Sequence, residues 1–83
     1  MNRNVVKKYV KVATLVEEDG SIKPLCVFWD DGRRFEIDRI IDCRPAASLK
    51  AGGQGVRYTC RILGTESYLY FENPRWFVEE KVR

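Results

Sequence analysis

Arginine and tyrosine side chains recur at short, even spacings in two neighbouring segments of the sequence. Arg57 and Arg61 lie four positions apart in the first segment, and Tyr68 and Tyr70 lie two positions apart in the second. Residues separated by an even number of positions share one face of a β-strand, so each pair lies on one side if both segments are strands. Guanidinium groups attract phosphates and phenol rings stack on bases. This combination therefore predicts a surface that binds single-stranded nucleic acid.

The turn between these two segments sets which side chains meet across the hairpin. Gly64-Thr65 has glycine at the first position of a two-residue connection, which is typical of a type II′ turn. Counting outward from this turn places Arg61 opposite Tyr68 and Thr59 opposite Tyr70. We therefore expect cations and rings to alternate across the two strands on one face of the hairpin.

A glycine-rich segment over residues 51–55 precedes this hairpin and follows Lys50. It lacks the Gly-Lys-Ser/Thr ending of a phosphate-binding loop, and we expect a flexible connection there. Lys50 is a candidate third cation beside Arg57 and Arg61. The alternative is that the N-terminal strand or this loop covers the face, with the arginine stems packed on the tyrosine rings as structural cation–π pairs.

A second hairpin is predicted over residues 22–37. Its turn is Asp31-Gly32, because both residue types tolerate positive φ. Counting outward from this turn places Phe28 opposite Phe35, so one apolar face is matched on both strands.

Three further side chains are candidates for contacts with a protein partner. Trp29 is expected to face away from Phe28 and toward Arg34, as a rim residue or an exposed contact. Phe77 is expected beside the arginine and tyrosine side chains, because a turn around Pro74 brings the last strand back along the hairpin. A protein-interaction or accessory domain that uses Trp29, Arg34 and Phe77, or an open strand edge, is the alternative to nucleic-acid binding.

The residue types needed for catalysis or for a metal site are scarce. The chain has no histidine, and no nucleophile–base pair can be named among its residues, so we expect no enzymatic activity. Cys26, Cys43 and Cys60 are widely spaced and form no Cys-x-x-Cys pair, so we expect neither a metal site nor a cofactor. Cys26 and Cys60 share strand faces with aromatic residues, which predicts buried and reduced core residues.

Length and composition predict one small domain over residues 1–83, with 1–4 and 81–83 frayed. The sequence is 45% hydrophobic, which is enough for a core. Its formal net charge of +3 favours an acidic partner without requiring one. The N-terminus has no apolar segment like that of a signal peptide, and no stretch approaches the ~20 apolar residues of a membrane span. We therefore expect a cytoplasmic protein without a membrane partner.

The alternation of apolar and polar residues predicts an all-β chain. Six strands are expected, over residues 5–17, 22–29, 33–43, 56–63, 66–72 and 75–80. Ile40-Ile41 interrupts the alternation of the third strand, which predicts a bulge or bend, and residues 45–50 have room for one helical turn. Six strands with short turns predict a small antiparallel barrel or roll of SH3-like or OB-like size, because closure protects strand edges.

Several motifs of the chain resemble those of an uncharacterised family of small bacterial β-domains. The matching segments are Gly20-x-x-x-Pro24, Phe28-Trp29-Asp30-Asp31-Gly32-Arg33-Arg34-Phe35-Glu36-Ile37, Ile41-Asp42-Cys43-Arg44, Arg57-Tyr58-Thr59-Cys60-Arg61, Tyr68-Leu69-Tyr70-Phe71 and Arg75-Trp76-Phe77-Val78. A similar domain is found in some bacteria at the C-terminal end of Y-family translesion DNA polymerases. The resemblance implies a small β-domain with a DNA-repair context. Because the family has no assigned activity, it implies no residue roles.

These patterns predict a non-enzymatic binding module with single-stranded nucleic acid as its first candidate partner. The candidate residues for that partner are Arg57, Arg61, Tyr68, Tyr70 and Lys50. Solvent exposure of the two tyrosines separates this hypothesis from the protein-interaction alternative, because a buried ring cannot stack on a base.

Overall fold

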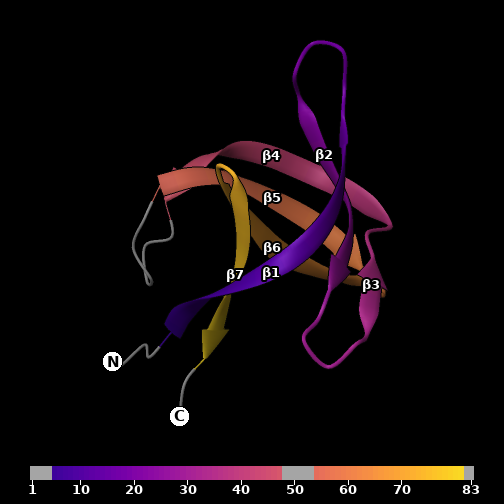
Figure 1. The fold of residues 1–83 in the computed structure, drawn as a ribbon, viewed down its shortest axis with the longest axis vertical. Helices are drawn as coiled ribbons and strands as arrows, with labels where there is room; N and C mark the ends of the chain where they lie inside the picture. Colours follow the sequence, from indigo (N-terminus) through magenta and orange to yellow (C-terminus); the bar gives the residue numbers. More distant parts are fainter. Residues whose placement is uncertain (1–4, 48–53, 82–83) are drawn as a thin grey trace.

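The computed structural model describes residues 5–47 and 54–81, whose strands form one antiparallel sheet. The strands are β1 (Val5–Val16), β2 (Ile22–Phe28), β3 (Arg34–Glu36), β4 (Arg39–Ala47), β5 (Gln54–Ile62), β6 (Thr65–Glu72) and β7 (Arg75–Lys81). They lie in the order β3-β2-β1-β7-β6-β5-β4 and curl into a half-barrel (Figure 1). The all-β prediction is confirmed. None of the described residues is helical, so no helix able to cross a membrane is found among them.

The described part of the chain has seven strands where six were predicted, because the expected third strand, over 33–43, is divided. Its first part, β3, pairs with β2, and its second part, β4, pairs with β5. Between them, the main-chain N–H of Ile37 donates to Leu25 of β2, and that of Asp38 donates to Arg61 of β5. The chain thus passes from one edge of the sheet to the other at residues 37–38. β4 continues through residue 47, so the helical turn predicted over 45–50 is wrong for its described part.

Alternate residues of the strands point into the half-barrel and form its core. The most buried members are Val27, Tyr58, Cys60, Leu69 and Trp76. Burial of Cys60 and Cys26, at 0% and 6% exposure, confirms the prediction that both belong to the core. The Tyr58 hydroxyl donates to the main-chain oxygen of Ile22 at 2.7 Å. Burial raises the pKa of Tyr58 to about 12 and that of the Cys60 thiol to about 11.

The β2–β3 hairpin has a three-residue loop instead of the predicted two-residue turn. The main-chain N–H of Gly32 donates to the carbonyl of Trp29 at 3.1 Å, and Gly32 has a positive φ of 93°. The additional loop residue shifts the register by one position, so Val27 and not Phe28 lies opposite Phe35. The predicted pairing of Phe28 with Phe35 is therefore wrong, and Val27 is the core residue of the two.

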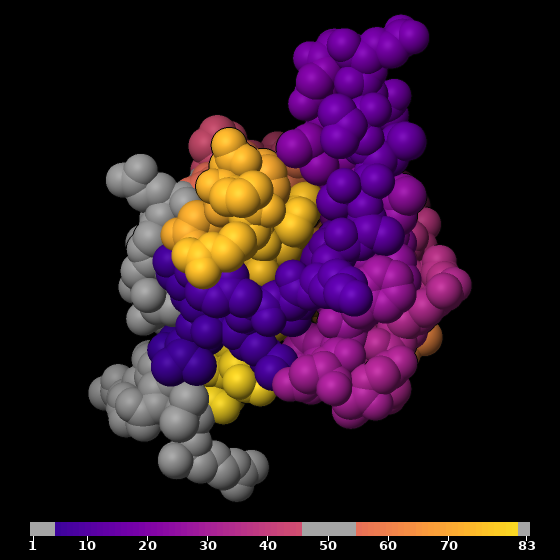
Figure 2. Space-filling view, in the orientation of Figure 1, coloured from indigo at the N-terminus to yellow at the C-terminus, as the bar shows by residue number. Residues whose placement is uncertain are grey.

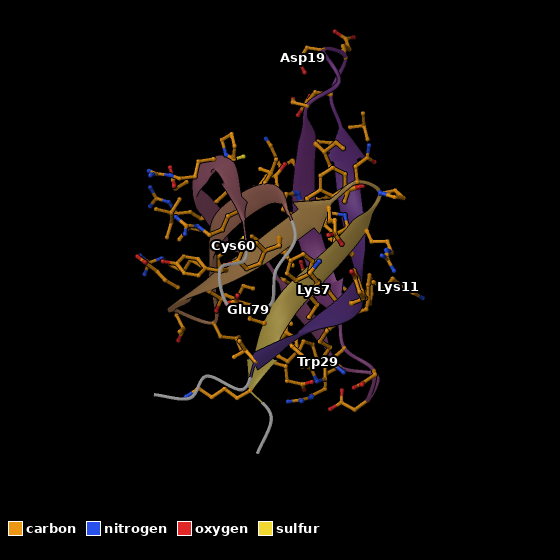
Figure 3. The ribbon with its side chains drawn as sticks, turned by 90° about the vertical axis from the view of Figure 1, so that its left-hand side faces the viewer. Lys7, Lys11, Asp19, Trp29, Cys60 and Glu79 are labelled. Atoms are coloured by element: carbon orange, nitrogen blue, oxygen red, sulfur yellow. The ribbon has the colours of Figure 1, made fainter. Side chains whose placement is uncertain are left out.

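The β1–β2 hairpin extends beyond the rest of the molecule. Figure 2 shows it standing clear of the body, and Figure 3 labels Asp19 at its tip. The tip closes through main-chain hydrogen bonds from Glu17 to Ser21 and from Gly20 to Glu17. The tip carries Glu17, Glu18 and Asp19 and is therefore acidic.

Candidate nucleic-acid interface

The arginine and tyrosine residues identified in the sequence lie on one face of the β5–β6 hairpin, in a different register from that predicted. The turn is Leu63-Gly64, whose φ angles of 52° and 77° are both positive, as in a type I′ turn. The cross-strand pairs on this face are Arg57–Tyr70, Thr59–Tyr68 and Arg61–Glu66. They differ from the predicted pairs by two positions. A shift of two positions preserves the face of every side chain, so all of these residues still lie opposite the core face.

A bulge in β4 adds two further arginines to this face. The register of β4 on β5 shifts by one residue at Ile41, which confirms the predicted irregularity. As a result, Arg39 lies opposite Arg61 and Arg44 lies opposite Arg57, although positions 39 and 44 would occupy opposite faces of a regular strand. The doubled isoleucine signals the bulge in the sequence, but the register is needed to place both arginines. We call Arg39, Arg44, Arg57 and Arg61, together with Tyr68, the arginine face.

The arginine face sets like charges directly opposite one another, an arrangement that is unfavourable in a sheet. Two acidic side chains reduce this repulsion. Asp42 accepts a hydrogen bond from Arg44 Nε at 2.8 Å, and Glu66 lies 4.0 Å from Arg61 Nη2. The hydrogen bond from Arg44 lowers the pKa of the Asp42 carboxyl. With four guanidinium groups against two carboxylates, the face remains positively charged.

Tyr68 is the accessible ring of the arginine face, with 51% of its surface exposed. The guanidinium carbon of Arg57 lies 4.5 Å from the centre of the Tyr68 ring, in a cation–π contact. The Arg57 Nε–H group is buried and has no hydrogen-bond acceptor in the part of the chain that the structure describes. The pair therefore offers a flat ring and a cation side by side, and the tyrosine is half-exposed.

Tyr70 and Phe77, two of the predicted contact residues, are buried, at 5% and 2% exposure. The two residues are cross-strand neighbours in β6 and β7, and their rings stack with centres 4.9 Å apart and an angle of 3° between planes. Tyr9 packs edge-on against Phe77, and Lys7 Nζ lies 4.9 Å from the Phe77 ring centre. Packed rings offer no open face to a base. The predicted stacking on Tyr70 and the predicted partner contact of Phe77 therefore lack the exposed ring surface that they need.

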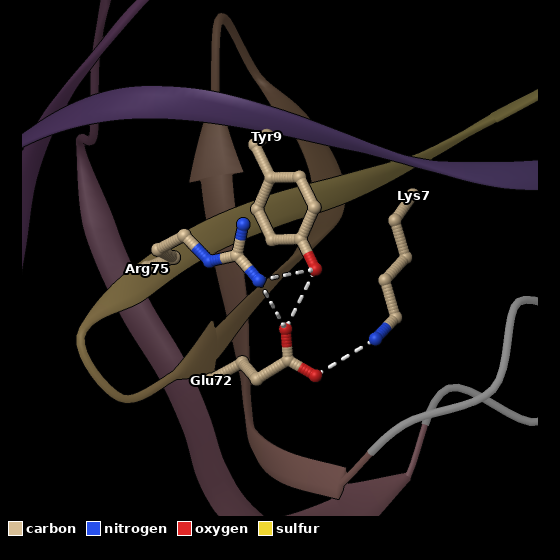
Figure 4. Close-up of polar contacts among 4 residues, drawn as sticks. All are labelled: Lys7, Tyr9, Glu72 and Arg75. Atoms are coloured by element: carbon tan, nitrogen blue, oxygen red, sulfur yellow. Dashed lines mark hydrogen bonds and ion pairs between the residues drawn. The ribbon is translucent and has the colours of Figure 1, made fainter.

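A polar cluster of Lys7, Tyr9, Glu72 and Arg75 joins β1, β6 and β7 beside these rings (Figure 4). Glu72 accepts hydrogen bonds from Lys7 Nζ at 2.7 Å and from the Tyr9 hydroxyl at 2.8 Å. These two bonds lower the pKa of the Glu72 carboxyl, with that from Lys7 making the larger contribution. The guanidinium carbon of Arg75 lies 3.9 Å from the centre of the Tyr9 ring. Because these cations are engaged within the cluster, the arginine face is the better candidate for phosphate binding.

The remaining predicted contact residues are Lys50, Trp29 and Arg34. Lys50 lies outside the described residues. Trp29 is half-buried, and its ring packs edge-on against Phe35 with centres 6.2 Å apart, which agrees with its prediction as a rim residue. Arg34 lies opposite Phe28 and not opposite Trp29. Arg34 is exposed on β3, where it pairs with Glu36 at 2.7 Å, and it is not part of the arginine face.

Within the described residues, no group of three or more cysteine or acidic side chains is arranged to hold a metal ion. The chemistry that the arginine face can perform is binding, through phosphate contacts and stacking. Comparison with protein-family models, with curated proteins and with solved structures found no match to this chain. Inference about function therefore rests on the geometry of the arginine face.

Proposed function

We propose that this chain is a small, non-enzymatic module of the β-barrel type that binds single-stranded nucleic acid through the arginine face. The observation that carries the proposal is the placement of four arginines around one half-exposed tyrosine on β4, β5 and β6. Guanidinium groups hydrogen-bond phosphates in a fixed geometry, and an accessible ring stacks on any base.

The arginine face is unfavourable for folding, and this is a second observation that supports a binding role. Two arginine pairs lie directly across from each other, and the buried Nε–H of Arg57 has no acceptor among the described residues. Both features cost free energy in the unbound protein. Departures from the rules of stable packing are most often found at functional sites. Phosphate groups bound at this face would relieve the repulsion between the arginines.

The proposal is tested by fluorescence anisotropy with a labelled, mixed-sequence oligonucleotide of ~10 nucleotides. If the four arginines each contact a phosphate, the slope of log K against log salt for a single strand is about −3, so affinity falls roughly 50-fold between about 50 and about 200 mM salt. A duplex of the same sequence should bind more weakly, because its bases are not free to stack on Tyr68.

Arg44 and Arg34 provide a matched pair of variants. Each side chain is 61% exposed, and each pairs with an acidic residue two positions away, at 2.8 and 2.7 Å. Arg44→Gln should weaken binding several-fold and reduce the steepness of the salt slope by about 0.7, whereas Arg34→Gln should change neither. Equal effects of the two substitutions would mean that overall charge, and not the arginine face, attracts the strand. Absence of binding at tens of micromolar protein in low salt would remove the proposal and leave the protein-interaction alternative.

A further inference from the structure

β6 and β7 separate soon after the turn that joins them and leave a gap in the sheet. Their register covers three residue pairs, which run from Glu72–Arg75 to Tyr70–Phe77. Beyond these pairs β7 follows β1 as far as Lys81, while β6 follows β5 as far as Thr65. Figure 1 shows the two strands diverging from their shared turn. The wall of the half-barrel is therefore open between the facing edges of β6 and β7.

A cavity of about 540 Å³ occupies this gap and extends into the interior of the half-barrel. Its inner walls are apolar and include Trp29, Phe35, Leu69 and Val78. The volume lies within the range of sites that bind small molecules. Apolar walls with a few polar groups are also typical of such sites. The gap thus gives access to a site for a flat, largely apolar group.

The mouth of the cavity adjoins the arginine face through Tyr68. This residue lies on the arginine face, where Arg57 covers part of its ring, and it also lines the cavity. The side chains of Thr65 and Ser67, which also line the cavity, carry hydroxyl groups that can hydrogen-bond a ligand. A strand whose phosphates lie on the arginines therefore runs past the opening.

We infer, on the basis of the function proposed above, that the cavity between β6 and β7 takes one unstacked nucleobase of the bound strand. A neutral base can bury its ring beside Trp29 and Phe35 while its phosphates remain on the arginines. The apolar walls of the cavity disfavour entry of a charged phosphate, which keeps the backbone of the strand outside. Proteins hold bases that have left a stack in this way, between aromatic and apolar side chains.

The fluorescence of Trp29 reports directly on insertion of a base, because contact with a nucleobase quenches indole emission. Tryptophan fluorescence and anisotropy are measured with two ligands, the ~10-nucleotide single strand and a strand of the same length that consists of abasic sites. The intact strand should bind about tenfold more tightly than the abasic strand and should alone quench the emission. Trp29→Phe should remove the fluorescence change, since Trp76 is buried and does not line this cavity.

A variant that fills the cavity separates base insertion from stacking on the outer surface of Tyr68. Ser67 is exposed and lines the cavity, so Ser67→Phe places a ring in the cavity without replacing a core residue. This variant should bind the intact strand about tenfold more weakly, with abasic binding and the salt slope unchanged. Thr14→Phe, which adds the same ring at an exposed strand position on the projecting hairpin, is the control and should bind normally.

The possible results distinguish a failure of base insertion from a failure of the proposed nucleic-acid binding. Normal affinity of Ser67→Phe, or wild-type Trp29 emission that the intact strand does not change, overturns base insertion and leaves the proposed function intact. Quenching by the abasic strand as well would assign the fluorescence change to the backbone and would also overturn base insertion. Failure of both strands to bind removes both proposals and favours a different occupant, such as an extended peptide on the open edge of β6.

Discussion

Arg39→Glu should make the fold more stable and the arginine face a weaker binding surface. Arg39 and Arg61 are direct cross-strand partners, so their charges repel in the unbound protein. An opposite-charge pair at such positions contributes about 0.2–1 kcal/mol, and a like-charge pair opposes folding. Arg39→Glu replaces the like-charge pair with an opposite-charge pair. We therefore expect a gain of about 0.5–1 kcal/mol in the free energy of unfolding, and about half of that gain for Arg39→Gln.

The magnitude is limited by the neighbouring carboxylate. Glu66 already lies 4.0 Å from Arg61 Nη2, so a new glutamate at position 39 shares the guanidinium with it. In a domain of this size, about 1 kcal/mol corresponds to a change of roughly 4–8 °C in Tm. We therefore expect Tm to rise by about 2–8 °C at low salt, and by less at about 1 M salt, where surface charges are screened.

Urea unfolding followed by tryptophan fluorescence measures the stability, and anisotropy measures the affinity for the oligonucleotide. A double-mutant cycle with Arg39→Gln and Arg61→Gln isolates the energy of the pair, and the coupling should show that each arginine destabilises the protein more when the other is present. Arg39→Glu should lower the affinity for a single strand at low salt by more than Arg39→Gln does. An Arg39→Glu variant that is no more stable than the wild type at low salt, with zero coupling in the cycle, would refute the assigned repulsion.

Three further changes test other parts of the structure. Gly55→Ala should destabilise the protein by about 1–3 kcal/mol in thermal unfolding, because a Cβ at this position would collide with the main-chain oxygen of Phe71. Hydrogen bonds from Lys7, which contributes most, and from Tyr9 hold the pKa of the Glu72 carboxyl below its usual value of 4.5 in the folded protein. The ionised carboxyl therefore contributes fully to the free energy of unfolding above pH 4.5, and this contribution is lost as the pH falls through the pKa of the folded state. Urea unfolding of Glu72→Gln should accordingly show a smaller loss of stability on acidification. Exposed Cys43 should react with a thiol reagent at about pH 8, whereas Cys60 should react only in denaturant, because burial raises its pKa to about 11.

The alternation of residue types was sufficient to predict which side chains share a face of the β5–β6 hairpin. Two turn positions were compatible with the sequence, Leu63-Gly64 and Gly64-Thr65, and they differ by two residues in register. A register shift of two residues leaves every side chain on the same face. The prediction of which residues share the face was therefore correct, although the predicted cross-strand pairs were wrong. In the β2–β3 hairpin the loop differed by one residue, and there the predicted pairing of Phe28 with Phe35 failed.

Local pattern thus determined the β character of the chain, the approximate strands, the burial of Cys26 and Cys60 and the position of the bulge, because all of these depend on neighbouring residues. The tertiary structure decided the rest. The bulge at Ile41 gathers four arginines on one face only because β4 lies beside β5, and Tyr70 is buried only because β7 places Phe77 against it. The gap between β6 and β7 arises because the curled sheet carries β7 along β1 and away from β6. Such contacts join residues far apart in the chain, and no local pattern specifies them.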